Sequence, residues 1–131
     1  MQSLFAPEMH ECRIIRMEFR IESNVEIKLL KLTVSGELSA SDVDILADRV
    51  KRFEGKDYRC ILDISSMEMI GMSVAGHAVD VATKQMLDAF AGYCLVAGGS
   101  MLQLISMFAG KEFVDGHLAR SVDEAMKKLE L

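Results

Sequence analysis

The fold is decided by residues 61–76, which read ILDISSMEMIGMSVAG. This stretch begins with an apolar run typical of a buried strand, continues through small and polar residues, and leads into a helix that we expect to start near Ser73. Backbone N–H groups at a helix start lack intrahelical partners and carry the positive end of the helix dipole, which favours a hydroxyl or phosphate there. Residues 65–76 are therefore the first candidate for a functional site.

The chain on either side of this stretch carries strand patterns. Apolar and charged residues alternate over residues 15–22, which predicts a strand with one solvated face, and Ser23 and Asn24 are expected to form the turn that follows. Adjacent Leu29 and Leu30 interrupt the alternation in the next strand and predict a bulge or burial on both faces. The expected strands are residues 15–22, 25–34, 58–64, 93–97 and 113–118.

Capping residues indicate where helices begin. Ser39 and Ser41 each precede an Asp by three residues, and Ser121 precedes Glu124 by the same interval, which is the spacing of a capping box. The expected helices cover residues 42–53, 73–90, 100–108 and 121–129. Helices that alternate with strands after an opening hairpin predict an α/β fold with a mixed sheet of about four to five strands, covered by about four helices.

Composition predicts one acidic domain. The chain has 131 residues, half of them apolar, which is enough for a single core. We assign residues 13–131 to this domain and expect residues 1–12 to be a loosely ordered leader, because they show no periodicity. The net charge of −5 argues against nucleic acid or an anionic membrane as the main partner, since either would require a basic face.

Three cysteines without a close pair are typical of reduced thiols in a cytoplasmic protein. A metal site would need clustered ligands, and the close pair His10 and Cys12 lies in the expected leader, so we expect no metal and no cofactor. No secretory signal is visible at the start. Residues 89–110 carry no charge, but Gly98-Gly99-Ser100 favours a strand, a turn and a short helix over a membrane span.

Several motifs together make the chain similar to the STAS domain, the module of sulfate transporters and anti-sigma factor antagonists. The matching pieces cover residues 31–38 (KLTVSGEL), 62–65 (LDIS), 69–70 (MI), 94–98 (CLVAG) and 121–125 (SVDEA). The resemblance spans about residues 14–130. It implies the same order of strands and helices and a role in regulation through a protein partner.

The chain departs from this family at the functional position. Phosphorylatable members carry Asp-Ser-Ser-Gly or Asp-Ser-Thr-Gly there, and an ungapped alignment places these residues on Gly71, Met72, Ser73 and Val74. Met72 therefore occupies the position of the phosphate acceptor, and Ser73 is the only hydroxyl left within the aligned motif. We favour a role for Ser73 as the helix N-cap.

Other polar residues suggest structural roles. Ser65 and Ser66 are more typical of turn chemistry than of phosphorylation, and Asp63 is more typical of a turn cap than of a cation ligand. Cys94 lies in the middle of a strand and His77 is expected to form a surface pair with Asp80, so no catalytic residue is identified.

The sequence therefore predicts a non-enzymatic interaction module. The expected partner-binding residues are Ser65, Ser66, Gly71, Met72, Ser73 and Gly76. The resemblance implies an ATP-binding serine kinase that acts as an anti-sigma factor as the partner, and self-association is compatible with the sequence. The alternatives are a cytoplasmic subunit of a transporter or sensory assembly and, with less support, a small flavodoxin-like enzyme, for which no glycine-rich phosphate loop is visible.

Overall fold

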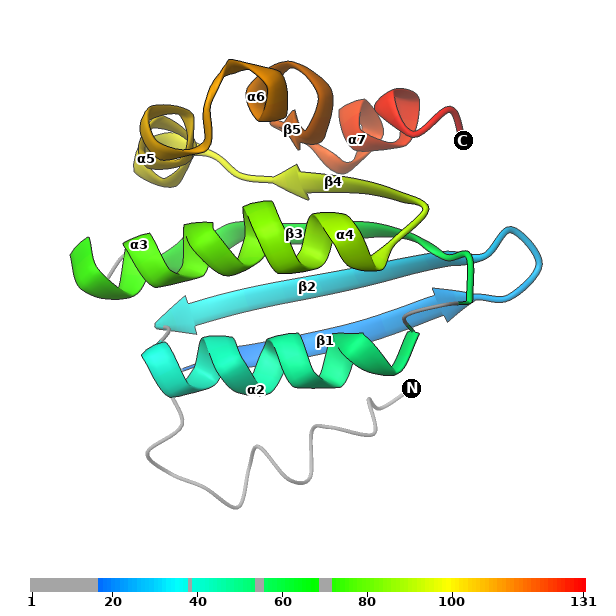
Figure 1. Ribbon diagram of the computed structural model, residues 1–131, viewed down its shortest axis with the longest axis horizontal. Coiled ribbons are helices and arrows are strands. Elements are labelled where there is room, and N and C mark those ends of the chain that lie inside the picture. The colour runs from blue at the N-terminus through cyan, green and yellow to red at the C-terminus, as the bar shows by residue number, and fades with distance from the viewer. Residues whose placement is uncertain (1–16, 38, 54–55, 69–71) are drawn as a thin grey trace.

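The computed structural model describes residues 17–37, 39–53, 56–68 and 72–131. The expected leader, with its pair of His10 and Cys12, lies outside these ranges. A five-stranded sheet has the order β1-β2-β3-β4-β5 (Figure 1). Its strands are β1 (Met17–Asn24), β2 (Leu29–Glu37), β3 (Arg59–Glu68), β4 (Gly92–Val96) and β5 (Leu118–Ala119).

The helices alternate with these strands as the sequence predicts. They are α2 (Ala40–Val50) with the short 3-10 turn η1 (Lys51–Phe53), α3 (Met72–Asp80), the π-helical segment η2 (Val81–Gln85), α4 (Met86–Ala89), α5 (Gly99–Ala109), α6 (Lys111–His117) and α7 (Val122–Lys128). β1 and β2 form an antiparallel hairpin, whereas β2, β3, β4 and β5 pair in parallel. The predicted mixed α/β fold with an opening hairpin is confirmed.

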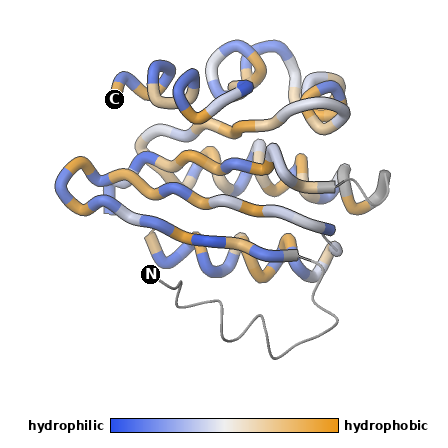
Figure 2. Tube along the Cα trace, turned by 180° about the vertical axis from the view of Figure 1, so that it is seen from behind, coloured by the Kyte–Doolittle hydropathy of each residue, from blue (hydrophilic) through white to orange (hydrophobic). Residues whose placement is uncertain are grey.

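The sheet has two apolar faces of unequal size. The larger one packs against α2, the α3–η2–α4 segment, α5 and α6, and the smaller one packs against α7. Leu30 is buried in the larger cluster and Leu29 packs against the smaller one, which confirms burial on both faces of β2. Figure 2 shows apolar and polar positions alternating along the β1–β2 hairpin, as expected for a sheet with one wet face.

Predicted caps begin two of the helices. The Ser39 side chain accepts from the Asp42 N–H while the Asp42 carboxylate accepts from the Ser39 N–H, which completes the capping box. Ser121 accepts from the Glu124 N–H in the same way at the start of α7. Asp44, the other expected capping partner, instead bonds to a side chain of α3.

The hairpin turn and the start of α5 differ from the sequence prediction, whereas the division of residues 89–110 agrees with it. The hairpin turn lies at residues 25–28 instead of at Ser23 and Asn24, and Lys28 takes a positive φ of 52° there. The uncharged run of residues 89–110 divides into β4, a short connection and α5, and no helix of the described chain is long and apolar enough to cross a membrane. α5 begins at Gly99, with Gly98 instead of Ser100 at its N-cap.

The largest correction concerns residues 113–118, which were expected to form an edge strand. They belong mostly to α6, and only Leu118 and Ala119 pair with β4. Phe113 and His117 lie four positions apart and therefore share one helix face, where their ring centroids are 5.5 Å apart.

Tyr93 carries a buried hydroxyl that matters for stability. Its side chain is fully buried, and its hydroxyl is the one buried side-chain nitrogen or oxygen of the described residues that has no hydrogen-bond partner. Burial is also the main cause that raises the pKa of this phenol. An unpaired buried hydroxyl destabilises a folded protein because it loses its bonds to water.

We therefore expect Tyr93→Phe to raise the free energy of unfolding by about 1 kcal/mol. Tyr58→Phe, which alters a half-buried ring next to Phe53, is the matched control and should bring no such gain. Denaturant unfolding followed by circular dichroism measures both. A loss of stability in Tyr93→Phe would show that the hydroxyl has a partner.

Candidate functional site at the end of β3 and the start of α3

The candidate site lies where the central strand β3 ends and α3 begins. β3 ends at Glu68 and α3 starts at Met72, so residues 69–71, including Gly71, fall outside the described ranges. This junction is at the carboxyl edge of the parallel strands (Figure 1). Binding sites of open α/β sheets form outside this edge.

β3 is longer than expected and contains a bulge. Thr33 pairs with Asp63 and Ser35 pairs with Ser66, so three steps along β3 match two steps along β2. The Asp63 carboxylate compensates for the irregular ladder, because its Oδ1 accepts from the Ser65 backbone N–H at 3.0 Å and from the Ser65 hydroxyl at 2.6 Å. Asp63 thus has the local capping role predicted for it, but inside a bulged strand.

The bulge also decides which face the last residues of β3 present. Ile64 packs in the larger apolar cluster, and one extra residue then turns Met67 toward the same face. Ser65 and Ser66 remain exposed. They were expected in a loop, and the structure places them in the strand instead, with the chain leaving the sheet only after Glu68.

Met72 and Ser73 are the first two residues of α3. The helix therefore begins one residue earlier than predicted. The prediction that Ser73 is the N-cap is corrected accordingly: Ser73 lies within the first turn.

Gly76 lies within α3, and no packing contact among the described residues explains why a glycine stands there. A Cβ built on Gly76 would meet none of their atoms within 4 Å, and its φ is not in the left-handed region. A glycine inside a helix lowers stability relative to alanine.

A pair of side chains joins α3 to α2 beside this site. His77 Nε2 lies 2.9 Å from Asp44 Oδ1, and both side chains are partly exposed. His77 was expected to pair with Asp80, but Asp80 pairs with Lys84 at 2.7 Å on the same helix. The i,i+3 spacing would allow an ion pair between His77 and Asp80. His77 instead contacts Asp44 because α2 lies beside α3.

Cys60 and Cys94 are free and buried on adjacent strands, as predicted, and Cys12 lies outside the described residues. Burial raises the pKa of the Cys94 thiol to about 11 and that of Cys60 further above its usual range. Both thiols therefore stay protonated near neutral pH and are poor nucleophiles. Across the described part of the chain, no group of three His, Cys, Asp or Glu residues is placed to hold a metal ion.

The fold is similar to that of a solved anti-sigma factor antagonist from Mycobacterium paratuberculosis. The match covers 88% of this chain and 95% of that chain, with a TM-score of 0.65 and 17% sequence identity. No family model and no curated protein sequence matches the chain. The structural match confirms the STAS-type fold that the sequence motifs indicated.

The buried thiols make a testable prediction about reactivity and pH. Near neutral pH an alkylating reagent should leave Cys60 and Cys94 unmodified in the folded protein and modify both after unfolding. The unfolded chain loses its thiol protons near a pKa of about 8.5, below that of the folded chain, so stability should fall as the pH rises from there toward 11. Mass spectrometry of labelled peptides measures the first effect, and rapid labelling of Cys94 in the folded protein would contradict it.

Proposed function

We propose that this protein is a non-enzymatic regulatory module that binds a protein partner through the junction of β3 and α3. The docking surface comprises Ser65, Ser66, Gly71, Met72, Ser73 and Gly76. The observation that carries the proposal is the place of Gly76 within α3 at the carboxyl edge of the parallel strands, where the packing of the described chain does not require a glycine. A partner whose backbone or side chains pack against α3 at this point would explain why the position is a glycine.

The fold of the solved anti-sigma factor antagonist supports the class of partner. By analogy with that class, the partner is an ATP-binding serine kinase that acts as an anti-sigma factor. The exposed hydroxyls of Ser65 and Ser66 offer hydrogen bonds at the rim of the docking surface, whereas the thioether of Met72 offers apolar contact.

This chain lacks the hydroxyl group that accepts phosphate in phosphorylatable members of the family. The alignment to the family motif leaves Met72 at the acceptor position, and a thioether accepts no phosphate. A phosphoryl group on the remaining hydroxyl, Ser73, would add about two negative charges to the first turn of α3. We propose that binding is instead constitutive or controlled by a signal other than phosphorylation, and that the protein acts in the cytoplasm.

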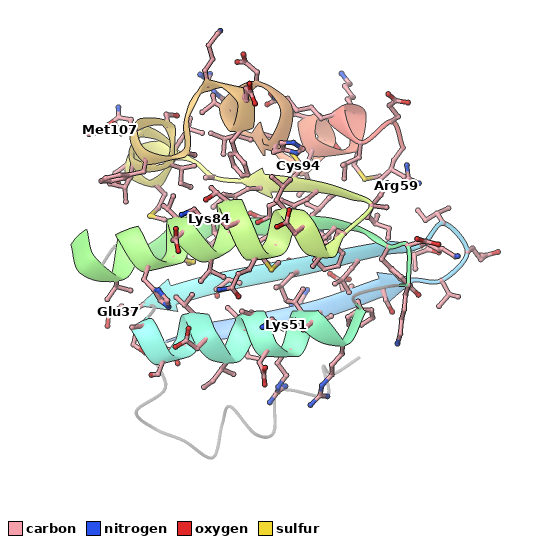
Figure 3. All side chains as sticks on the ribbon, viewed as in Figure 1. Glu37, Lys51, Arg59, Lys84, Cys94 and Met107 are labelled. Carbon is pink, nitrogen blue, oxygen red and sulfur yellow. The ribbon has the colours of Figure 1, made fainter. Side chains whose placement is uncertain are left out.

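Met72→Asp tests the proposed contact directly. A desolvated carboxylate in the interface should weaken binding to the kinase partner by about 2 kcal/mol or more while the thermal melt stays unchanged. Met107→Asp is the matched control, because Met107 is 75% exposed at the far end of α5 and points away from the fold (Figure 3). Calorimetric titration and thermal melts measure both variants. A collapsed melt in Met72→Asp would identify Met72 as a core residue and contradict its role as a contact.

Gly76→Ala should change the stability of the domain and its affinity for the partner in opposite directions. Alanine should raise the free energy of unfolding by about 0.5–1 kcal/mol, since it favours the helix, and should still weaken partner binding because a methyl group now stands between the chains. Gly116→Ala in α6 is the control: Gly116 is equally free of close described neighbours, so this variant should leave the affinity unchanged. Unchanged affinity in Gly76→Ala would place the docking surface elsewhere.

A further inference from the structure

Helix α5 carries no charged residue, although part of its surface faces outward. Helix α2 has the same length and carries four charged residues, Asp42, Asp44, Asp48 and Arg49. A helix on the surface of a domain normally presents charged and polar side chains to water. The uncharged surface of α5 therefore calls for a reason beyond its packing in the fold.

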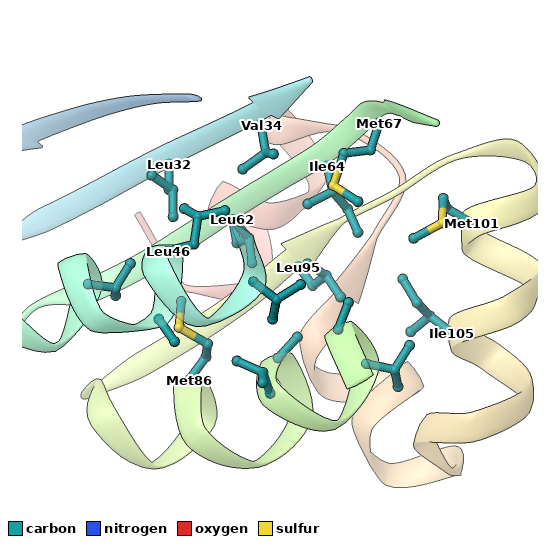
Figure 4. Close-up of a pocket in the computed structure, with 17 residues that line it drawn as sticks. Leu32, Val34, Leu46, Leu62, Ile64, Met67, Met86, Leu95, Met101 and Ile105 are labelled. Carbon is teal, nitrogen blue, oxygen red and sulfur yellow. The ribbon is translucent and has the colours of Figure 1, made fainter. Parts of the chain in front are cut away.

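The inner side of α5 is occupied by the core. Met101, Leu104 and Ile105 are buried, and Met101 and Ile105 line an apolar cavity of about 60 Å³ between the helices and the sheet (Figure 4). Residues that recur at intervals of three and four lie on one side of a helix. Packing within the chain thus explains the apolar residues of this side and leaves the exposed ones unexplained.

The exposed residues toward the end of α5 form what we name the α5 surface, which comprises Gln103, Ser106, Met107 and Phe108. Met107 is 75% exposed and points away from the fold (Figure 3). Phe108 follows the buried Leu104 by four residues and is nevertheless 53% exposed, so the last turn of the helix extends past the core. Two large apolar side chains next to each other on an uncharged surface are typical of a protein contact.

The polar groups of the α5 surface do not oppose such a contact. The Ser106 hydroxyl donates to the Leu102 carbonyl oxygen within the helix at 2.8 Å. It keeps this hydrogen bond when water is removed, so its burial costs less than that of an unpaired hydroxyl. The surface can therefore be covered without leaving a charge unpaired.

We propose that the α5 surface binds a second copy of this chain about a two-fold axis. Residues close to such an axis meet their own counterparts, so a charge there would face a like charge. Two copies also repel each other through their net charge of −5. An uncharged surface is where two acidic copies approach with the least repulsion, whereas a partner of different sequence could supply the opposite charge and would not require one.

Neighbouring helices surround the α5 surface with charges of both signs. α3 and α6 both contact α5. Lys111 and Asp115 of α6 form an exposed ion pair at 3.2 Å, and Asp80 of α3 forms another with Lys84 at 2.7 Å. Each pair places opposite charges four residues apart, so a second copy with its helices antiparallel can set an acid against each base. An uncharged centre with a polar rim is the usual arrangement of an interface.

The α5 surface shares no residue with the docking surface proposed at the junction of β3 and α3. Self-association and partner docking can therefore be tested separately. Met107→Asp should abolish the first and leave the affinity for the proposed kinase partner unchanged.

Charge variants of Met107 in the intact chain test the proposal. Sedimentation equilibrium should show that the wild type dimerises as its concentration rises, whereas Met107→Asp and Met107→Lys should each stay monomeric, because a desolvated like charge stands on both copies. An equimolar mixture of the two variants should recover the dimer, since opposite charges then meet across the contact. Val25→Asp is the matched control, because Val25 is 72% exposed in the turn between β1 and β2, and this variant should dimerise like the wild type.

Methyl NMR of the wild type gives a second measurement that needs no variant. The Met107 methyl signal should shift as the concentration rises, and the signal of Met126, which packs in the smaller cluster, should not.

Three results would overturn the proposal. The first is a wild type that stays monomeric at every concentration, with an unchanged Met107 signal. The second is a dimer that Met107→Asp leaves intact, which would place the contact elsewhere. The third is a pair of folded, monomeric variants whose mixture does not dimerise, which would show that two copies do not meet at Met107.

Discussion

Burial of the central strands β3 and β4 on both faces is the constraint on which the rest of the structure depends. In β3, Leu62 packs toward the larger helical layer while Ile61 packs toward α7, and in β4, Leu95 and Cys94 divide in the same way. Parallel strands with two apolar faces are stable only if the chain supplies helices to both sides. The helix order follows from this requirement, including α7, which Arg59 of β3 holds by donating from Nη1 to the Leu129 carbonyl at 2.9 Å.

The same constraint sets the place of the site. Crossover helices cover the faces of the sheet and leave its carboxyl edge to the loops and helix starts, so the end of β3 meets the start of α3 there. The β3 bulge makes the last residues of this strand face in different directions. Ser65 and Ser66 stay exposed at the proposed docking surface, while Met67 turns inward to the apolar cavity. One added residue in a strand thus places two exposed serines and a half-buried methionine on different sides of this edge.

Local sequence signals predicted most of the fold because their causes are local. The capping box of Ser39 and Asp42 and the apolar stripe of α2 depend only on neighbours within one helix, and both are observed. The bulge in β3 depends on its register against β2, and the partner of His77 depends on where α2 lies, so neither could be inferred from spacing. The end of β3 was predicted too early for the same reason, since pairing with β2 keeps two polar serines in the strand.

The cavity and Gly76 illustrate what sequence patterns omit. The cavity arises from how a π-turn, three strands and several helices fit together, and no single segment encodes it. Gly76 was predicted as part of the site from its place in the stretch, and the structure adds that the described chain leaves the space beside it open.

Hydrogen exchange of the chain with and without the proposed kinase partner tests the central claim most directly. The account predicts that partner binding slows amide exchange in peptides from the end of β3 through the first turns of α3, with α6 and α7 unchanged. Slowed exchange confined to α5, α6 or α7, with the β3–α3 junction unaffected, would contradict it.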